Sequence, residues 1–243
     1  MKRCFAGLTD TGIVRSVNQD SYYIDESQGR FFIVADGMGG HAGGQEASKI
    51  ATEQIQAYLD AHWDNQDIPS EILLKNAIDQ ANQEILDDQS HHPERRDMGT
   101  TVVVMIFRER PWCAHVGDSR LYRWRDSKLE QVTDDHTWVS LALRSGEITK
   151  EQAKVHPWRH VLSQCLGRKD LYNIELQELD VQPGDQLLMC SDGLTEEVSD
   201  EEIQDCLSKS DNYKEAAEKL IVAAKQAGGS DNITVVIVGE ESH

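Results

Sequence analysis

The sequence lacks the features that mark several special classes of protein. It has no Cys-x-x-Cys pair and an odd number of cysteines, 5, so neither a disulfide framework nor a cysteine-type zinc site is expected. It has only 5 prolines in 243 residues, which argues against a collagen-like or disordered chain. Its longest apolar runs, such as Val102–Phe107, fall far short of the ~18 residues that a membrane helix needs. With no apolar stretch of a signal peptide near Met1, we expect a globular, cytoplasmic protein.

Positive charge is also scarce. Lys and Arg number 24 against 43 Asp and Glu, which gives a formal net charge of −19. So negative a surface repels nucleic acid and anionic membranes, and we expect neither as a partner. The acidity is explained either by surface solubility or, in part, by carboxylates that bind metal ions.

The hydrophobic pattern predicts strands and helices within one domain over residues 1–243. Strands are expected at Tyr22–Ile24, Arg30–Ala35, Thr100–Phe107, Trp112–Val116, Arg120–Trp124, Lys128–Val132, Ile174–Leu179, Gln186–Cys190 and Asn232–Val238. Helices are expected at 47–59, from a cap at Ser70, within a mostly helical stretch over about 135–167, after capping boxes at Thr149 and Ser199, and at Tyr213–Ala227. Because the strands come in adjacent runs, antiparallel sheets covered by helices are favoured over a parallel sheet.

Aspartates recur where predicted strands begin or end. Asp36 and Asp192 each follow a strongly apolar strand and precede a glycine, which lets the backbone turn sharply. Asp118 follows another strand, and Asp231 stands just before the last one. Four strand edges therefore each present a carboxylate at a loop.

Two explanations of this pattern are open. Asp-Gly is a common turn pair, so turn chemistry explains any one of these aspartates taken alone. If the sheets pack face to face, however, the strand ends can converge, and clustered carboxylates repel one another unless a proton or a cation neutralises them. Ligands that are all oxygen select hard ions, Mg²⁺ or Mn²⁺, over zinc.

Zinc is the competing metal hypothesis. His156 and His160 lie four residues apart, a spacing that chelates zinc on a helix. No third ligand is near them in the sequence, and no His-Glu-x-x-His motif occurs. Zinc is therefore the weaker alternative.

Six segments together resemble one known family. In chain order they are Arg15–Asp20, Val34–His41, Met98–Thr101, Gly117–Arg120, Ser191–Thr195 and Gly229–Thr234. In this order, spread over nearly the whole chain, they are similar to the metal-dependent protein phosphatases of the PPM family, the type 2C serine/threonine phosphatases. The similarity is greatest to the single-domain bacterial branch.

The resemblance implies an α+β fold. In that fold two antiparallel β-sheets pack together as a four-layer α-β-β-α sandwich, with helix pairs on both outer faces and a helical flap insertion, here about 135–167. The resemblance also implies two tightly bound Mn²⁺ or Mg²⁺ ions and a weaker third. By motif, Asp36 bridges the two ions, the Gly37 carbonyl helps hold one of them, and Asp192 and Asp231 hold the other.

Further positions have implied roles. Asp20 supports the metal site, and Asp118 matches a position linked to the weaker third ion. Arg15 matches the phosphate-binding arginine, although an isolated arginine is usually only a surface residue. Met38 stands where animal relatives carry the histidine assigned as general acid. His41 is the natural candidate for that role, and its rival role is to bond the loop backbone or a metal-bound water.

The implied activity is hydrolysis of phosphoserine and phosphothreonine in a phosphorylated protein, by water activated between two metal ions and without a covalent phosphoenzyme. We expect the enzyme to be a monomer. A non-catalytic member that binds phosphoproteins or metals is one alternative, and the presence of Asp36, Asp192 and Asp231 argues against it. A hydrolase of small phosphate metabolites is the other, and the sequence does not decide between the two substrate classes.

Overall fold

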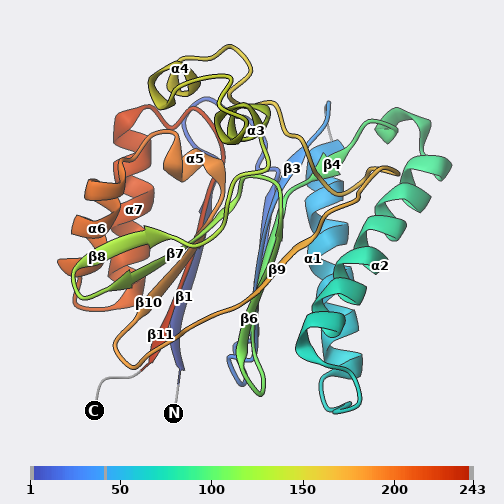
Figure 1. The fold of residues 1–243 in the computed structure, drawn as a ribbon, viewed down its shortest axis with the longest axis horizontal. Helices are drawn as coiled ribbons and strands as arrows, with labels where there is room; N and C mark the ends of the chain where they lie inside the picture. The colour runs from blue at the N-terminus through green and yellow to red at the C-terminus, as the bar shows by residue number, and fades with distance from the viewer. Residues whose placement is uncertain (1–2, 41–42, 241–243) are drawn as a thin grey trace.

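Two antiparallel β-sheets form the centre of the protein in a computed structural model, which describes residues 3–40 and 43–240 (Figure 1). The first sheet has the strand order β1-β11-β10-β7-β8. Its strands are β1 (Arg3–Asp10), β7 (Arg120–Arg125), β8 (Lys128–Gln131), β10 (Gln186–Cys190) and β11 (Ile233–Glu240). The strand β1, which the hydrophobic pattern did not predict, pairs along its whole length with β11 at the other end of the chain.

The second sheet has the strand order β2-β3-β5-β6-β9, and the short strand β4 also pairs with β3. Its strands are β2 (Asp20–Ile24), β3 (Phe31–Met38), β4 (Gly99–Thr100), β5 (Val102–Phe107), β6 (Pro111–Val116) and β9 (Glu175–Glu178). In β3, alternate side chains point to opposite faces. Phe32 and Val34 enter the core between the two sheets, whereas Phe31, Ile33 and Ala35 face the covering helices.

Helix pairs cover the outer face of each sheet (Figure 1). The second sheet is covered by α1 (Gly43–His62) and α2 (Ser70–His91), and the first by α6 (Asp200–Ser208) and α7 (Tyr213–Ala227). On α1 the buried stripe contains Ala47, Ala51, Ile55 and Leu59, which recur every four residues. Full burial of a side chain such as Ile55 contributes about 2 kcal/mol. The α+β sandwich of four layers is therefore confirmed.

Capping motifs explain where several helices begin. The capping boxes predicted at Thr149 and Ser199 are both formed, at the starts of α4 (Lys150–Lys154) and α6. The cap predicted at Ser70 is wrong. Ser70 is the first residue of α2, and Pro69 occupies the cap position without a side-chain hydrogen bond.

The flap segment, residues 135–167, lies over one end of the sandwich (Figure 1). It contains only two short helices, α3 (Trp138–Arg144) and α4, so the expectation of a mostly helical stretch is too strong. Aromatic rings hold it together instead, because Trp138 stacks on His156 with centroids 4.6 Å apart and meets Trp158 edge-on at 5.0 Å. Two shorter elements complete the fold: η1 (Pro93–Arg95) and α5 (Asp192–Thr195).

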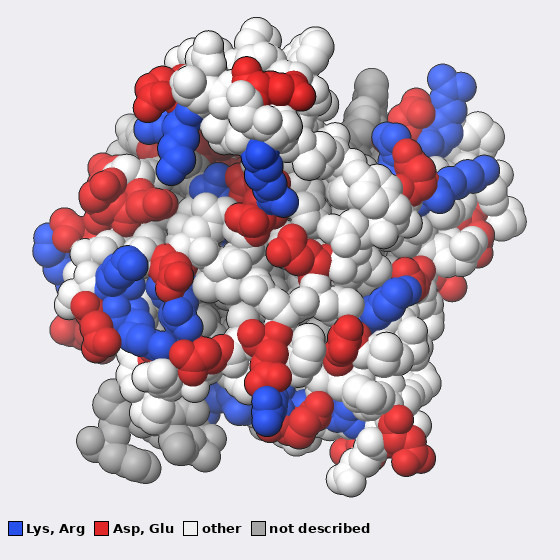
Figure 2. All heavy atoms as spheres, in the orientation of Figure 1, with Lys and Arg blue, Asp and Glu red and all other residues white. Residues whose placement is uncertain are grey.

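The surface mixes charges of both signs on the face shown in Figure 2. Arginines of β7 are paired with acids: Arg123 contacts Glu130 at 2.7 Å, and Arg125 contacts Asp185 at 2.7 Å. The positive charge of these two arginines is therefore balanced by neighbouring acids. Among the helices of the described residues, none has the length and apolar character to cross a membrane.

Candidate metal centre

The predicted aspartates converge on one cavity at the end of the sandwich beneath the flap segment. Asp36 lies within β3, which continues through Gly37 to Met38, so the sharp turn expected at Gly37 is wrong. Asp118 follows β6, Asp192 begins α5 just after β10, and Asp231 precedes β11. All four line a cavity of about 400 Å³. Asp20, at the start of β2, lies directly opposite Asp36 in the antiparallel pair of strands. Like charges placed opposite one another in this way destabilise a sheet unless they are compensated.

The electrostatics of the cavity show the strain between these carboxyl groups. Burial, followed by the charges of Asp20 and Asp192, holds the pKa of Asp36 well above its ordinary value. The protonated form of Asp36 is therefore favoured when no cation is bound, and this form can donate a hydrogen bond to the carboxylate of Asp192. Burial, followed by the charges of Asp192 and Asp135, raises the pKa of Asp118 in the same way. A bound cation would replace these protons.

Two carboxylate oxygens test whether a metal ion fits here. Asp20 Oδ1 and Asp192 Oδ1 are buried and have no hydrogen-bond partner among the described residues. The other oxygen of Asp20 accepts hydrogen bonds from Ser191 Oγ at 2.7 Å and Thr234 Oγ1 at 2.6 Å. An unsatisfied buried acceptor costs about 1–3 kcal/mol, and coordination of a cation removes that cost. The donor set is all oxygen and anionic, which fits Mg²⁺ or Mn²⁺.

Arg15 and Gly37, two further predicted site residues, also line this cavity. Arg15 Nη2 donates to Asp231 Oδ2 at 2.6 Å, which holds a half-exposed guanidinium beside the carboxylates. Gly37 packs against the first turn of α1, where a Cβ on it would lie 2.0 Å from the carbonyl oxygen of Gly44. Glycine is therefore required at position 37 for the helix to approach the end of β3.

Comparison with known proteins gives the family of this chain. Residues 13–233 match the sequence profile of protein phosphatase 2C. The chain belongs to the protein phosphatase 2C family of enzymes. It is 36% identical over 236 residues to the serine/threonine protein phosphatase PstP of Mycobacterium tuberculosis, a match that covers 96% of this chain but only 44% of PstP. It is 35% identical over 235 residues to the protein phosphatase PhpP of Streptococcus pneumoniae, and this match covers 95% of each chain.

Solved structures of phosphatase 2C proteins have the same fold. The crystal structure of the Mycobacterium tuberculosis phosphatase PstP/Ppp matches with a TM-score of 0.88 and 36% identity, over 100% of both chains. A structure of the PstP catalytic domain in complex with 2 manganese ions matches with a TM-score of 0.84 and 34% identity, over 98% of this chain and 97% of that one.

Thr101 is a residue of this phosphatase 2C site that sequence reasoning assigned no role. Its hydroxyl accepts a hydrogen bond from the Asp36 backbone N–H at 3.0 Å and shares another with Ser119 Oγ at 2.6 Å. The Thr101 N–H donates to the Asp36 carbonyl at 2.8 Å. Thr101 thus fixes the backbones that carry Asp36 and Asp118 relative to each other. Its place in the matched segment Met98–Thr101 was the only signal in the sequence.

Asn232 has a similar role next to Asp231 and was also missed. It is 3% exposed, and its amide donates to the carbonyl oxygens of Thr11 at 2.9 Å and Val17 at 3.0 Å. Its side-chain oxygen accepts from the Gln19 backbone N–H at 2.7 Å. These bonds hold the loop that carries Arg15 against the start of β11, so they explain why an arginine distant in sequence reaches the carboxylates.

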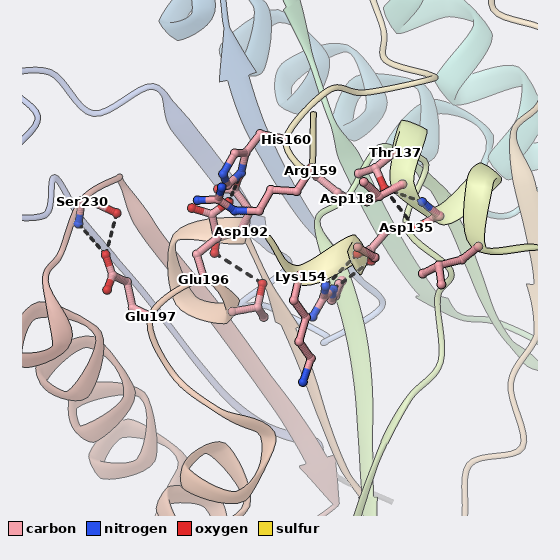
Figure 3. Close-up of a pocket in the computed structure, with 16 residues that line it drawn as sticks. Asp118, Asp135, Thr137, Lys154, Arg159, His160, Asp192, Glu196, Glu197 and Ser230 are labelled. Atoms are coloured by element: carbon pink, nitrogen blue, oxygen red, sulfur yellow. Dashed lines mark hydrogen bonds and ion pairs between the residues drawn. The ribbon is translucent and has the colours of Figure 1, made fainter. Parts of the chain in front are cut away.

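A second, larger cavity of about 690 Å³ adjoins the carboxylates under the flap segment (Figure 3). Asp118 and Asp192 line it from the sheet edge, and Lys154, Arg159 and His160 line it from the flap segment. The two cavities share Asp118, Asp192 and His160, so they form a continuous lining around the predicted metal positions.

The structure contradicts the zinc hypothesis for His156 and His160. The two histidines do not share a helix, because α4 ends before them. The Nδ1 atom of His156 accepts a hydrogen bond from the Trp158 N–H at 3.1 Å, whereas His160 lies with Asp192 and Glu196. His41, the predicted general acid, lies outside the described residues, so its role stays a prediction.

Proposed function

We propose that this phosphatase 2C chain hydrolyses phosphoserine and phosphothreonine in phosphoproteins, using two bound Mn²⁺ or Mg²⁺ ions and a weaker third. One observation carries the proposal: carboxylates from separate strands meet in one cavity, where the raised pKa values of Asp36 and Asp118 and the orphaned oxygen of Asp192 call for cations, as does the orphaned oxygen of Asp20 opposite Asp36. The two manganese ions in the structure of the related PstP catalytic domain support this choice of metal.

The chain offers separate residues for each ion. Asp36 would bridge the two ions, with the Gly37 carbonyl on one of them and with Asp192 and Asp231 on the other. Asp118, at the boundary of the two cavities, would hold the weaker third ion. When bound, such ions supply a water of lowered pKa as the nucleophile and neutralise charge on the phosphoryl oxygens.

Arg15 would orient the phosphate. Its planar guanidinium presents several N–H donors, and two of them match the spacing of two phosphate oxygens. In the structure one donor is engaged by Asp231, and the side chain is 50% exposed, so the remaining donors are accessible from the cavity. Phosphate bound at Arg15 therefore lies next to the carboxylates that hold the metal ions.

Attack by water, with no covalent phosphoenzyme, is supported by the state of the nucleophilic side chains. Among the described residues that line the smaller cavity, Cys165 and Thr101 are the ones with a thiol or hydroxyl. Burial raises the pKa of the Cys165 thiol, so it is protonated and a poor nucleophile at neutral pH. The Thr101 hydroxyl is hydrogen-bonded to Asp36 and Ser119.

A protein substrate is favoured by the larger cavity. A phosphate at Arg15 occupies the smaller cavity, and the adjoining 690 Å³ leaves room for residues next to the phosphorylated side chain. Its lining offers partners of several kinds to a peptide: the carboxylates Asp135 and Glu197, the cations Lys154 and Arg159, and apolar side chains of α3.

The test is a steady-state assay of the purified chain with phosphoserine and phosphothreonine peptides beside a panel of sugar phosphates, in a Mn²⁺ titration. We expect turnover of the peptides that depends on Mn²⁺, and loss of at least about 100-fold in Asp36→Asn. Asp64→Asn, which changes an exposed carboxylate between α1 and α2, is the matched control and should retain activity. Faster turnover of sugar phosphates, or full activity in Asp36→Asn, would contradict the proposal.

A further inference from the structure

A pair of buried histidines lies directly behind Asp118. His115 belongs to β6 and is 1% exposed, while His136 lies at the start of the flap segment and is 7% exposed. Their rings stack with centroids 4.6 Å apart and planes inclined by 26°. Buried histidines are uncommon, so the contacts of these two rings require an explanation.

His136 makes hydrogen bonds to both backbone polar groups of Gly117, its N–H and its carbonyl. The His136 backbone N–H donates to the Gly117 carbonyl oxygen at 2.9 Å. The Gly117 N–H in turn donates to His136 Nδ1 at 3.2 Å. Gly117 has a φ of 108°, and a Cβ on it would lie 2.6 Å from the side chain of Thr101. This backbone position is therefore fixed by packing on one side and by His136 on the other.

These bonds define the tautomers of both rings. Because His136 Nδ1 accepts from Gly117, its proton resides on Nε2, which faces Glu175 Oε2 at 3.3 Å. His115 Nε2 lies 2.9 Å from the Asp134 carbonyl oxygen and must donate to it. His115, His136 and Glu175 are close enough to chelate a metal ion, but both imidazole nitrogens that face Glu175 carry protons. The hydrogen bonds of this cluster join it to Gly117, the Asp134 carbonyl and Glu175.

We propose that His136 is a positioning residue for Asp118: its Nδ1 fixes the peptide group before Gly117 and its backbone N–H fixes the one after, and together they aim the Asp118 carboxylate at the weakly held ion. On its other side, Asp118 is followed by Ser119, which is held by Thr101. Both neighbours of Asp118 are therefore held by hydrogen bonds: Gly117 by His136 at the start of the flap segment, and Ser119 by Thr101. This inference rests on the proposed function of Asp118.

Two variants of His136 separate this role from simple packing. In His136→Asn the amide oxygen can take the place of Nδ1 and accept from the Gly117 N–H. In His136→Gln the amide group reaches the place of Nε2, and the acceptor for Gly117 is lost. We expect His136→Asn to stay near wild type. His136→Gln should lower kcat by about 10–100-fold and raise the Mn²⁺ concentration for half-maximal activity, with KM for a phosphopeptide unchanged.

The matched control is Glu175→Gln. The glutamine oxygen still accepts from His136 Nε2, and the bond between His136 Nδ1 and Gly117 is untouched, so this variant should behave as wild type. Equal losses in His136→Asn and His136→Gln would show that His136 acts only by filling space. Wild-type kcat and Mn²⁺ dependence in a folded His136→Gln would also overturn the proposal.

A spectroscopic measurement tests the contact without catalysis. In uniformly ¹⁵N-labelled protein stripped of metal, the hydrogen bond predicts a through-bond ¹⁵N–¹⁵N coupling between the Gly117 amide and His136 Nδ1. Its absence from the wild-type protein would refute the proposed contact, whatever the fate of His136→Gln. Because the coupling needs neither metal nor substrate, its presence in a protein without phosphatase activity would refute the proposed function and leave the contact standing.

Discussion

Arg15 and Asp231 form an ion pair across the mouth of the smaller cavity, with Nη2 and Oδ2 2.6 Å apart. Their side chains are 50% and 30% exposed. An ion pair this accessible contributes only about 0–1 kcal/mol to stability. The pair therefore matters for where the guanidinium lies, which is next to the carboxylates, and hardly for the stability of the fold.

Replacement of Arg15 should accordingly affect binding and not folding. In Arg15→Ala we expect KM for a phosphopeptide to rise by about 10-fold or more, because a charged hydrogen bond to phosphate contributes about 1.5–3 kcal/mol. The loss in kcat should be smaller, and the melting temperature should stay the same. Arg110→Ala is the control, because Arg110 is exposed and paired with Glu178 at 2.7 Å, at the opposite end of β6. Unchanged KM and unchanged inhibition by inorganic phosphate in Arg15→Ala would show that Arg15 is only a surface residue and does not bind phosphate.

Thr101→Val tests the hydroxyl that joins two strands behind the carboxylates. Valine keeps the shape but leaves the Asp36 N–H and the Ser119 hydroxyl without their shared partner. We expect the free energy of unfolding in urea to fall by about 1–3 kcal/mol, since Thr101 is 1% exposed. Activity should fall as well, because the backbone of Asp36 is released. Thr195→Val, a change at a half-buried threonine of α5, is the comparison. Equal stability of Thr101→Val and wild type would rule out this role.

Asp20 contributes to the pH dependence of stability in a direction that can be stated. Burial raises its pKa from 3.8 to about 7 in the folded protein stripped of metal. Between those values the folded chain binds a proton that the unfolded chain does not, so stability falls as pH rises from about 4 to about 7. The loss is on the order of a few kcal/mol, because one pKa unit corresponds to about 1.4 kcal/mol. The measurement is the free energy of unfolding in urea, with a chelator present, at pH 5 and at pH 8.

Asp20→Asn is the control for this effect, because the amide cannot titrate. It should reduce the pH dependence of the chelated protein by the part that Asp20 contributes, while Asp36 and Asp118, whose pKa values are also raised, keep the rest. Arg30 lowers the pKa of Asp25, and acids of this kind change the stability only below about pH 4. They therefore do not hide the change that Asp20 causes between pH 5 and pH 8. Saturating Mn²⁺ should reverse the trend, since metal ions bind the deprotonated carboxylates. Greater stability of the chelated protein at pH 8 than at pH 5 would contradict the assignment.

Asp118 and His41 are predicted to serve one proton-transfer step. Asp118→Ala should keep the two tightly bound ions yet reduce turnover, because a single carboxylate holds an ion weakly. If His41 protonates the leaving group with the help of that ion, the losses in Asp118→Ala and His41→Ala should not add in the double variant. The measurements are kcat across a Mn²⁺ titration and metal content after desalting. Strictly additive losses with both ions retained would separate the two roles.

Much of the metal site could be predicted from local patterns in the sequence. An apolar run followed by Asp-Gly is visible without a structure, because the strand and its burial depend on neighbouring residues. Asp36 and Asp192 were found in this way, and the order of six segments indicated the family. The amphipathic helices α1 and α7 were equally readable, since a buried stripe repeats along one face.

The tertiary structure decided what depends on contacts between distant segments. The strand β1 has no strong apolar run of its own and exists because β11 pairs with it across the whole chain. Two hydrogen bonds near the site, from Thr101 to Ser119 and from Gly117 to His136, depend on how strands and loops are arranged in space. The spacing of residues in the sequence does not reveal them. The sequence by itself determined which carboxylates are available. Only packing of the two sheets, which brings buried strand ends together away from water, decided that they repel one another and require cations.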